Sequence, residues 1–325
     1  MNRTAQHMAG EVLMAGGLAL CLLSSACIFD SEPEEPGFPS ELAATVSLES
    51  TGQPVLCKCM TNSEVALVAA GSGLAVIDLY AGETIGVLDT GVEIDDIADS
   101  DVDGYGYVLA GPGVYPVDLA APGLGTPVKL SAPGSFMAVS PAGDLAWVAL
   151  ENDSLAQLNL ASMEAAVLKE PLAENCQGLA SGDNGALFAA LGNEGVIAGW
   201  ETGSWSELGR VSVPGEVIDL FPGPSGYVCA ITGGSNELWF IRTIDCKLYK
   251  MITFPETPSA AASMPDGLHA FASCANSGLM VVAENGETLL RTMDFGLPVS
   301  IDITRSGNMA VLCSQEERKV YILVR

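Results

Sequence analysis

The sequence has little positive charge and little histidine. Lysine and arginine together number 13 against 40 aspartates and glutamates, and the formal net charge is −27. Nucleic-acid binding needs a basic surface that displaces counterions from phosphate, so this composition argues against it. The sequence has only two histidines and no Ser-His-Asp order, phosphate-binding loop or haem-attachment motif. Such a charge favours cationic partners or metal ions.

The N-terminal apolar run is also too short to cross a bilayer. Residues 12–23 are apolar for 12 positions, whereas a membrane-spanning helix needs about 20. Arg3 precedes this run, and small residues occupy positions 24–26. A basic start, a short apolar core and a small-residue end are typical of a signal peptide. We therefore predict a signal peptide over residues 1–26.

A repeat fills most of the remaining chain. Residues 138–160, AVSPAGDLAWVALENDSLAQLNL, predict a strand, a turn, a second strand, a polar loop and a third strand. Six other segments share this layout, and the residue that opens the second strand recurs at Glu64, Gly104, Gly143, Gly185, Gly226, Gly267 and Gly307. These anchors are 39 to 42 residues apart, which is the period of propeller blades. The prediction is an all-β fold over residues 41–325, a seven-bladed β-propeller with four-stranded antiparallel blades.

The two ends of the chain indicate how the ring closes. Residues 319–325, KVYILVR, occupy the third-strand position of the seventh unit and leave that blade without a fourth strand. Residues 44–54, ATVSLESTGQP, align with the fourth-strand segment at 84–94, TIGVLDTGVEI. We therefore expect an N-terminal strand to complete the last blade and cover its exposed edge.

The repeat resembles a known sequence family. The stretch at 138–160 is similar to the YVTN-type β-propeller repeat of bacterial surface and quinoprotein-like propellers, and the resemblance extends over about residues 39–325. It implies the propeller fold. That family includes binding proteins and cofactor enzymes, so the resemblance does not assign a function.

The signal segment has a resemblance of its own. Residues 23–27, LSSAC, resemble the lipobox of bacterial lipoproteins, which implies that Cys27 is lipidated after cleavage. Residues 27–40 would then be the lipidated cysteine and an acidic, proline-rich tether that is too polar to fold. The resemblance implies a cell-envelope protein that meets the membrane through its lipid anchor alone, at the outer membrane where one exists. Because Ser24 and Ala26 also fit an ordinary secretory site, secretion is the alternative.

Acidic residues gather in one set of predicted loops. In a propeller, the loops from fourth to first strands and from second to third strands share a face. Those loops carry Glu93, Asp95, Glu151, Asp153, Glu174, Glu194 and Glu216, followed by Glu237, Glu256, Glu316 and Glu317. Their negative potential could recruit a cationic ligand or an envelope protein. The alternative is a solvated surface that keeps the protein soluble.

One loop has the beginning of a calcium motif. Asp99, Asp101 and Asp103, followed by Gly104, match D-x-D-x-D-G, in which alternate carboxylates converge on Ca²⁺. The twelfth position is Ala110, which cannot supply the usual bidentate carboxylate. The motif also coincides with the first turn of blade two, so a plain turn is the alternative.

The cysteines do not define a metal site. Cys229, Cys274 and Cys313 fall in predicted second strands, where a buried thiol packs as a small apolar side chain. Cys57 and Cys59 place two thiols on one face of a strand, which is weak support for zinc without nearby histidines. Seven cysteines follow Cys27, so at least one has no partner within the chain.

These patterns predict a monomeric envelope lipoprotein whose propeller is a non-catalytic binding or scaffolding module. Two alternatives stay open. One is a purely structural envelope protein. The other is a metal-dependent enzyme with a site on the ring axis, carried by acidic residues such as Glu93, Asp95, Glu174 and Glu216. The single histidine beyond the signal, His269, is expected in a second strand and is more typical of packing than of catalysis.

Overall fold

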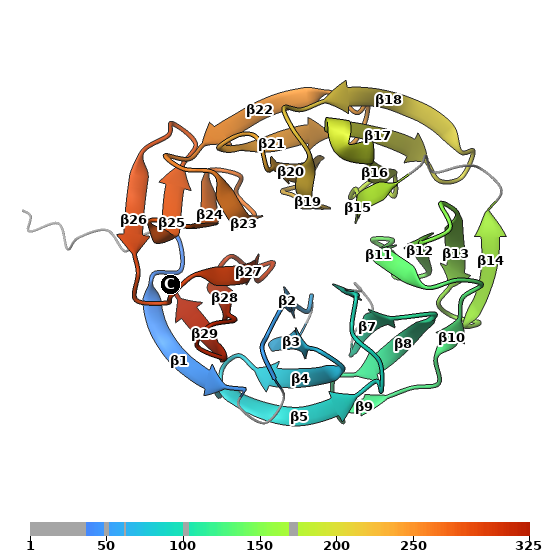
Figure 1. The fold of residues 1–325 in the computed structure, drawn as a ribbon, viewed down its shortest axis with the longest axis horizontal. Helices are drawn as coiled ribbons and strands as arrows, with labels where there is room; N and C mark the ends of the chain where they lie inside the picture. The colour runs from blue at the N-terminus through green and yellow to red at the C-terminus, as the bar shows by residue number, and fades with distance from the viewer. Residues whose placement is uncertain (1–36, 49–51, 62, 100–103, 169–174) are drawn as a thin grey trace, which may run out of the picture. The chain divides into compact units, whose positions relative to one another are not determined.

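The computed structural model describes residues 37–48, 52–61, 63–99, 104–168 and 175–325. These residues form seven antiparallel sheets arranged in a ring, with the first strand of each sheet nearest the axis (Figure 1). The predicted fold class, a seven-bladed propeller with four-stranded blades, is confirmed. The predicted signal peptide and Cys27 lie outside the described residues.

The strands follow one another blade by blade along the chain. Blades one and two comprise β2 (Leu56–Cys59), β3 (Val65–Ala70), β4 (Gly73–Asp78), β5 (Glu83–Asp89), then β6 (Asp96–Ala98), β7 (Tyr105–Ala110), β8 (Gly113–Asp118), β9 (Gly123–Leu124) and β10 (Val128–Lys129). Blades three and four comprise β11 (Gly134–Val139), β12 (Leu145–Leu150), β13 (Leu155–Asn159), β14 (Glu164–Leu168), then β15 (Cys176–Ser181), β16 (Leu187–Leu191), the 3₁₀ turn η1 (Gly192–Glu194), β17 (Val196–Glu201) and β18 (Ser206–Ser212).

The remaining three blades complete the ring. Blades five and six comprise β19 (Val217–Pro222), β20 (Tyr227–Thr232), β21 (Glu237–Arg242), β22 (Leu248–Thr253), then β23 (Pro258–Ser263), β24 (His269–Cys274), β25 (Gly278–Ala283) and β26 (Thr288–Thr292). Blade seven comprises β27 (Pro298–Ile303), β28 (Met309–Ser314), β29 (Lys319–Val324) and, from the other end of the chain, β1 (Glu41–Ser47).

The hydrophobic core is divided among the seams between blades. Seven clusters of buried side chains are present in the described residues, and each joins two neighbouring blades. The second and third strands, such as β3 and β4, are almost entirely buried because a sheet covers each of their faces. The fourth strands, such as β5, lie at the outside and are largely exposed. Burial therefore follows position in the blade.

The turns between first and second strands use the anchor glycines of the repeat. Their φ angles are positive, for example 67° at Gly143 and 87° at Gly226, a conformation that glycine adopts without a Cβ clash. Blade two departs from the common plan because its fourth strand is split into β9 and β10. Pro127 interrupts it, and Pro116 in the facing strand β8 also lacks the N–H that a ladder needs.

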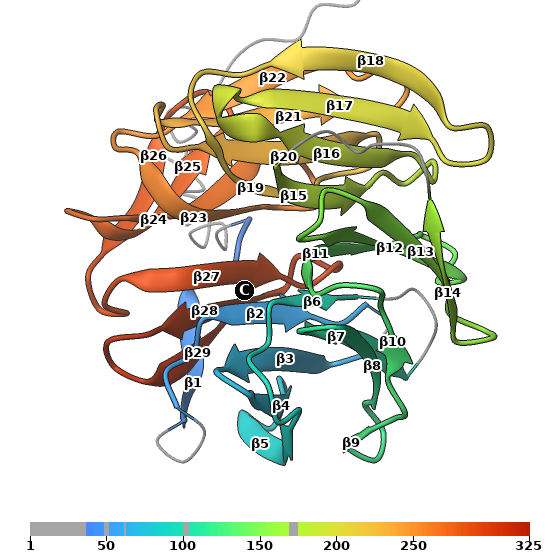
Figure 2. The ribbon, with the colours of Figure 1, turned by 45° about the vertical axis from the view of Figure 1, so that its right-hand side comes forward.

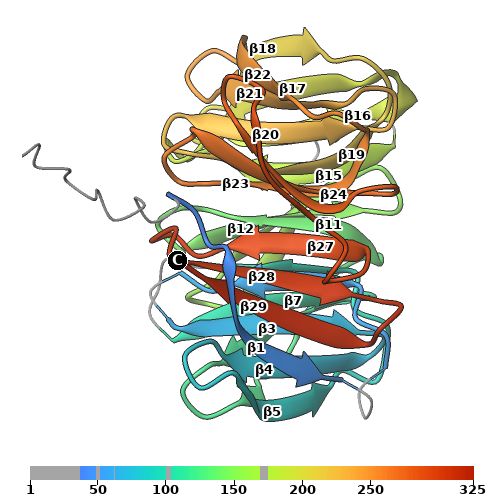
Figure 3. The same cartoon turned by 90° about the vertical axis from the view of Figure 1, so that its left-hand side faces the viewer.

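The N-terminal strand closes the ring as predicted. β1 pairs antiparallel with β29, from Glu41 opposite Val324 to Ser47 opposite Lys319, and Figure 3 shows it along the outer side of β29. The backbone N–H of Ser40 extends the ladder with a bond of 3.0 Å to the carbonyl oxygen of Val324. The last blade thus has its fourth strand, and the edge of β29 is covered.

The residues just before β1 are also part of the ring. Phe38 is buried between blades six and seven, with its ring 5.7 Å from that of His269 and 6.2 Å from that of Phe271. The described chain therefore starts at the end of blade seven where β29 finishes and where the second strand of blade six begins. No helix among the described residues is long and apolar enough to cross a membrane.

Deleting residues 41–47 should destabilise the propeller and promote aggregation. The deletion removes the β1–β29 ladder, at about 1 kcal/mol per lost hydrogen bond, and it leaves β29 as an unpaired edge. Thermal melting and size-exclusion chromatography would measure both effects. Deleting residues 28–36, which precede Phe38, is the control and should leave the melting temperature unchanged. Equal melting temperatures for the two deletions would contradict closure by β1.

Candidate functional site

One face of the ring is built from two kinds of loop. Strands within a blade alternate in direction, so the loops from second to third strands and from each fourth strand to the next first strand emerge together. We call this side the loop face. It comprises residues 52–55, 71–72, 90–95, 111–112, 130–133, 151–154, 192–195, 213–216, 233–236, 254–257, 275–277, 293–297 and 315–318.

The predicted acidic residues that the structure describes lie on the loop face. Glu93, Asp95, Glu151, Asp153, Glu194 and Glu216 are all exposed there, and Glu174 lies outside the described residues. Asp153 accepts a hydrogen bond from the backbone N–H of Asn175 at 3.1 Å. The exposed carboxylates give this face a negative electrostatic potential.

Three of these carboxylates are close enough to influence one another. The pKa of Asp95 is raised, mainly by partial burial, and the negative charges of Glu93 and Glu151 raise it further. A hydrogen bond of 2.7 Å from the backbone N–H of Gly111 opposes this change and fixes the Asp95 carboxylate. The structure thus brings these three predicted residues together where blades one, two and three meet on the loop face.

The mouth of the axis on the loop face is partly apolar, which the sequence did not predict. In five blades the first strand begins with a register shift that leaves one residue unpaired. These residues and the corresponding two in blades one and two form what we call the axial collar: Val55, Asp95, Ser135, Gln177, Ile218, Ser259 and Val299. Ile218 is 43% exposed. The register shift turns an apolar side chain toward solvent.

More apolar side chains are exposed on the same face. Besides Val55, Ile218 and Val299 of the axial collar, the loops expose Val92, Met293 and Leu297. Scattered apolar residues are ordinary on protein surfaces, but a group at one mouth, with carboxylates in the surrounding loops, is typical of interaction sites. The loop face therefore combines exposed apolar side chains, three of them in the axial collar, with exposed carboxylates.

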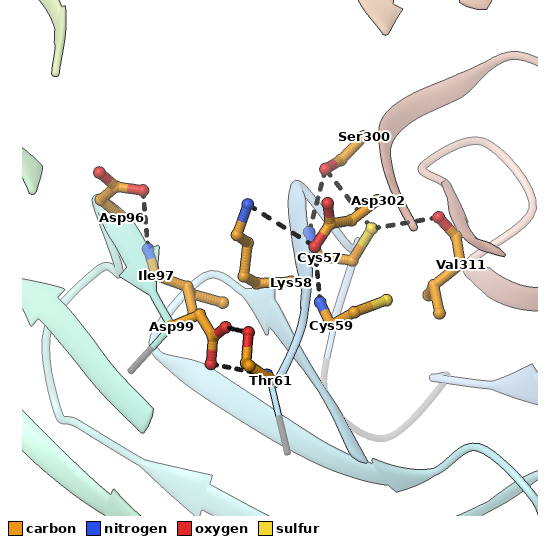
Figure 4. A network of polar contacts seen from close by, with 10 residues as sticks. All are labelled: Cys57, Lys58, Cys59, Thr61, Asp96, Ile97, Asp99, Ser300, Asp302 and Val311. Carbon is orange, nitrogen blue, oxygen red and sulfur yellow. Dashed lines mark hydrogen bonds and ion pairs between the residues drawn. The ribbon is translucent and has the colours of Figure 1, made fainter. Parts of the chain in front are cut away.

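Inside the ring, four charged side chains project from the first strands. Figure 2 shows β27, β2, β6 and β11 side by side around the axis, and Figure 4 shows the polar contacts near β2. Lys58 Nζ is 3.6 Å from Asp302 Oδ2, which also accepts a 2.7 Å hydrogen bond from the backbone N–H of Cys59. Asp96 Oδ2 accepts a 2.7 Å bond from the backbone N–H of Met137 in the next blade.

The charges at the axis alter one another's protonation. Burial acts to lower the pKa of Lys58, but the carboxylates of Asp302, Asp99 and Asp219 outweigh it and raise the pKa. Burial raises the pKa of Asp96 to about 7, against which its backbone hydrogen bonds act. Burial likewise raises the pKa of Asp219 to about 6. Asp219 is nevertheless exposed, whereas Asp96 is half-buried, so Asp96 is the group expected to titrate near neutral pH.

These axial residues differ from the ones predicted for an axial enzyme site. Glu93 and Glu216 lie in loops of the loop face and Asp95 lies in the axial collar, whereas Lys58, Asp96, Asp219 and Asp302 belong to the first strands. Within the described ranges, no group of three or more His, Cys, Asp or Glu side chains is placed to hold a metal ion. The contacts of Asp96 and Asp302 join neighbouring blades, so both have a structural role.

The calcium loop is described only at its start. Both carboxylate oxygens of Asp99 accept hydrogen bonds from Thr61 in blade one, one from the backbone N–H at 2.8 Å and one from the hydroxyl. Asp101 and Asp103 lie outside the described residues. Asp99 therefore links two blades through the oxygens that calcium would use, and the calcium site stays a prediction.

Comparison with known proteins yields a likeness of fold. No protein-family model matches the chain, and no curated protein matches it. Among solved structures, the β-propeller domain of Cps50 (Swd1) from Myceliophteria thermophila superposes with a TM-score of 0.73 at 13% sequence identity. The match covers 88% of this chain and 100% of that domain. At this identity the likeness carries the propeller fold and nothing of the activity.

The pKa of Asp96 predicts a pH dependence of stability. A carboxyl group with a pKa of about 7 in the fold, against 3.8 as its ordinary value, keeps its proton when the unfolded chain has lost it. Stability should therefore fall as pH rises from 4 to 7, by at most about 1.4 kcal/mol per pH unit.

Thermal or urea unfolding of the parent and of Asp96→Asn between pH 4 and pH 8 would measure this effect. The amide cannot ionise, so the variant should lose less stability than the parent over this range. Parallel stability curves for the two proteins would contradict the assignment. Asp118→Asn, at the end of β8, where its side chain accepts hydrogen bonds from the following turn, is the control for a general change in charge.

Proposed function

We propose that the protein is an exported, lipid-anchored envelope protein whose propeller binds a cationic partner on the loop face, without catalysis. One observation carries the proposal. Exposed apolar side chains at the mouth of the axis, such as Ile218 and Val299, share this face with the exposed carboxylates of Glu93, Asp95 and Glu151. Protein interfaces commonly have an apolar centre and a polar or charged rim.

The chemistry of the face specifies the chemistry of the partner. The apolar centre would bury an aliphatic or aromatic side chain, and each such burial contributes about 1.5–3 kcal/mol when complete. The carboxylates would attract lysine or arginine and accelerate association, with a dependence on salt. A protein segment that carries an apolar residue between basic residues fits both requirements. A neutral or acidic partner would meet uncompensated charge.

The place where the described chain begins is compatible with a free loop face. Phe38 and the beginning of β1 lie beside Val324 and His269, at the end of the blades opposite the loop face. A tether that runs from Cys27 to Gly37 would join the ring on that opposite side. Anchored in this way, the loop face would not carry the attachment and would remain open to a partner in the surrounding compartment.

Pull-down from envelope extracts with the immobilised propeller would test the binding role. The parent should retain a basic protein, and Ile218→Ser should weaken retention about tenfold, since it removes apolar contact area. Ile244→Ser is the matched control, because Ile244 is 72% exposed in a turn on the opposite side. A partner retained equally by the parent and Ile218→Ser would contradict the loop face as its site.

The acidic rim calls for a second pair of variants in the same assay. Glu151→Gln should reduce retention and flatten its salt dependence, because it removes one carboxylate near Asp95. Glu287→Gln, in an exposed turn on the opposite side, should change neither. If both variants respond to salt in the same way, the carboxylates of the loop face do not recruit the partner.

Replacing Cys27 by serine should release the protein from the membrane. The LSSAC segment at 23–27 motivates this prediction, because a lipobox cysteine carries the lipid and serine cannot replace it. Cell fractionation followed by a salt wash would place the parent with membranes and Cys27→Ser in the soluble fraction. A variant that still sediments after the wash would rule out this anchor.

A further inference from the structure

Three buried cysteines lie at the seam between the first and last blades. Cys57 and Cys59 come from β2, and Cys313 comes from β28. All three belong to the cluster that joins blades seven and one, and Cys57 and Cys313 are 2% and 0% exposed. These thiols have no part in the proposed binding face, and the sequence alone does not show that they meet.

The contacts of Cys57 point toward Cys313. The backbone N–H of Cys57 donates a 3.1 Å hydrogen bond to Ser300 Oγ, and Ser300 is the cross-strand neighbour of Cys313. The Cys57 thiol donates to the carbonyl oxygen of Val311 at 3.6 Å. Burial raises the pKa of the Cys313 thiol, and its interaction with the Cys57 thiol raises it further. Cys57 therefore packs against the segment of β28 that carries Cys313, and both thiols are free in the structure.

Cys59 is a less suitable partner for Cys313. Its backbone N–H is held by Asp302 on β27, and the cross-strand neighbour of Asp302 is Val311, not Cys313. A bond between Cys57 and Cys59 would join two side chains on one face of a single extended strand. The usual Cβ separation in a disulfide is about 3.8 Å, shorter than the spacing of alternate residues in a strand. The geometry favours the pair across the seam.

We propose that Cys57 and Cys313 form a disulfide bond that ties the first blade to the last. The oxidant is a disulfide compound. One protein thiolate attacks it and releases a thiol, and the second protein thiolate then attacks the mixed disulfide and releases another. The two cysteines lose two protons and two electrons, and the oxidant becomes two thiols. In cells this step rests on the proposed export, because cytosolic proteins keep their thiols reduced.

The burial of both thiols sets the time of oxidation. A thiol with almost no exposed surface reacts slowly, so the bond would form before blades one and seven close over it. Cys57 and Val311, two residues before Cys313, are 254 residues apart. A crosslink over so long a loop restricts the unfolded chain strongly. It would secure the inner side of the seam whose outer side β1 completes.

Peptide mapping of two samples would test the proposal. The first is the protein refolded from the reduced, denatured state in reduced and oxidised glutathione; the second is the protein isolated from the cell envelope. Both would be alkylated under denaturing conditions and digested without reduction. We expect a peptide pair joined through Cys57 and Cys313, lighter than its separate peptides by two hydrogen atoms. Cys57 alkylated in both samples, or a different pair, would overturn the proposal.

Melting temperatures give an independent readout. Reduction should lower the melting temperature of the oxidised parent by about 5 °C and should not change that of Cys57→Ala or Cys313→Ala. Cys229→Ala is the matched control, because Cys229 is a buried second-strand cysteine in another blade, and it should keep the parent's response. An unchanged parent would contradict the bond, even if the variants fail to fold.

The two samples separate this proposal from the proposed export. A bond in both samples supports the pairing and an oxidising location. A bond that forms on refolding but is missing from the protein isolated from cells supports the pairing and contradicts export. A bond missing from both samples overturns the pairing and leaves the binding role of the loop face to its own test.

Discussion

The ring depends on the seam between blade seven and blade one, because only there do the two ends of the chain meet. Three kinds of interaction hold it. The backbone ladder between β1 and β29 lies at the outside, and a buried apolar cluster lies in the middle. Near the axis, Ser300 and Asp302 accept hydrogen bonds from the backbone N–H groups of Cys57 and Cys59. Every other seam joins blades that are consecutive in sequence. Closing the seam between blades seven and one therefore has the largest loop-closure entropy cost.

Much of the acidity serves the fold. Asp96 and Asp302 accept backbone hydrogen bonds from an adjacent blade at the axis, and Asp183 does the same for Gly226 at 2.8 Å between blades four and five. Carboxylates such as Asp78 cap the turns between third and fourth strands. Net charge alone therefore overstates the charge available to a partner. The exposed carboxylates of the loop face differ in this respect. Of Glu93, Asp95, Glu151, Asp153, Glu194 and Glu216, Asp153 alone accepts a hydrogen bond from the segment of another blade within the described residues.

The sequence predicted features that recur and missed features that occur once. Anchor spacing predicted seven blades, and the unmatched end strands predicted closure by β1. The axial charges escaped notice because Lys58 and Asp219 occupy similar places in different units without forming a motif. These charged residues could have been located by counting back from the anchor residue of each unit to the first strand of that blade. Ile218 lies between Val217 and Asp219 in a mainly apolar segment that is typical of core, and the register shift exposes it. Phe38 lies in a segment that its polar and proline-rich composition assigned to the tether, and its burial in the ring was therefore not predicted.

The apolar mouth of the axis is the feature that the fold does not require. Serine occupies the same place in blades three and six, at Ser135 and Ser259, and the first strands there pair with the second as they do elsewhere. A polar residue at Ile218 or Val299 would thus satisfy the propeller equally well. Removing exposed apolar surface from water lowers the free energy, and this requires a partner that covers the surface. The carboxylates in the surrounding loops disfavour covering by a second copy of this acidic chain, since like charges would meet. A cationic partner would cover the apolar side chains without this repulsion. The exposed apolar residues and the carboxylates therefore favour the same kind of partner.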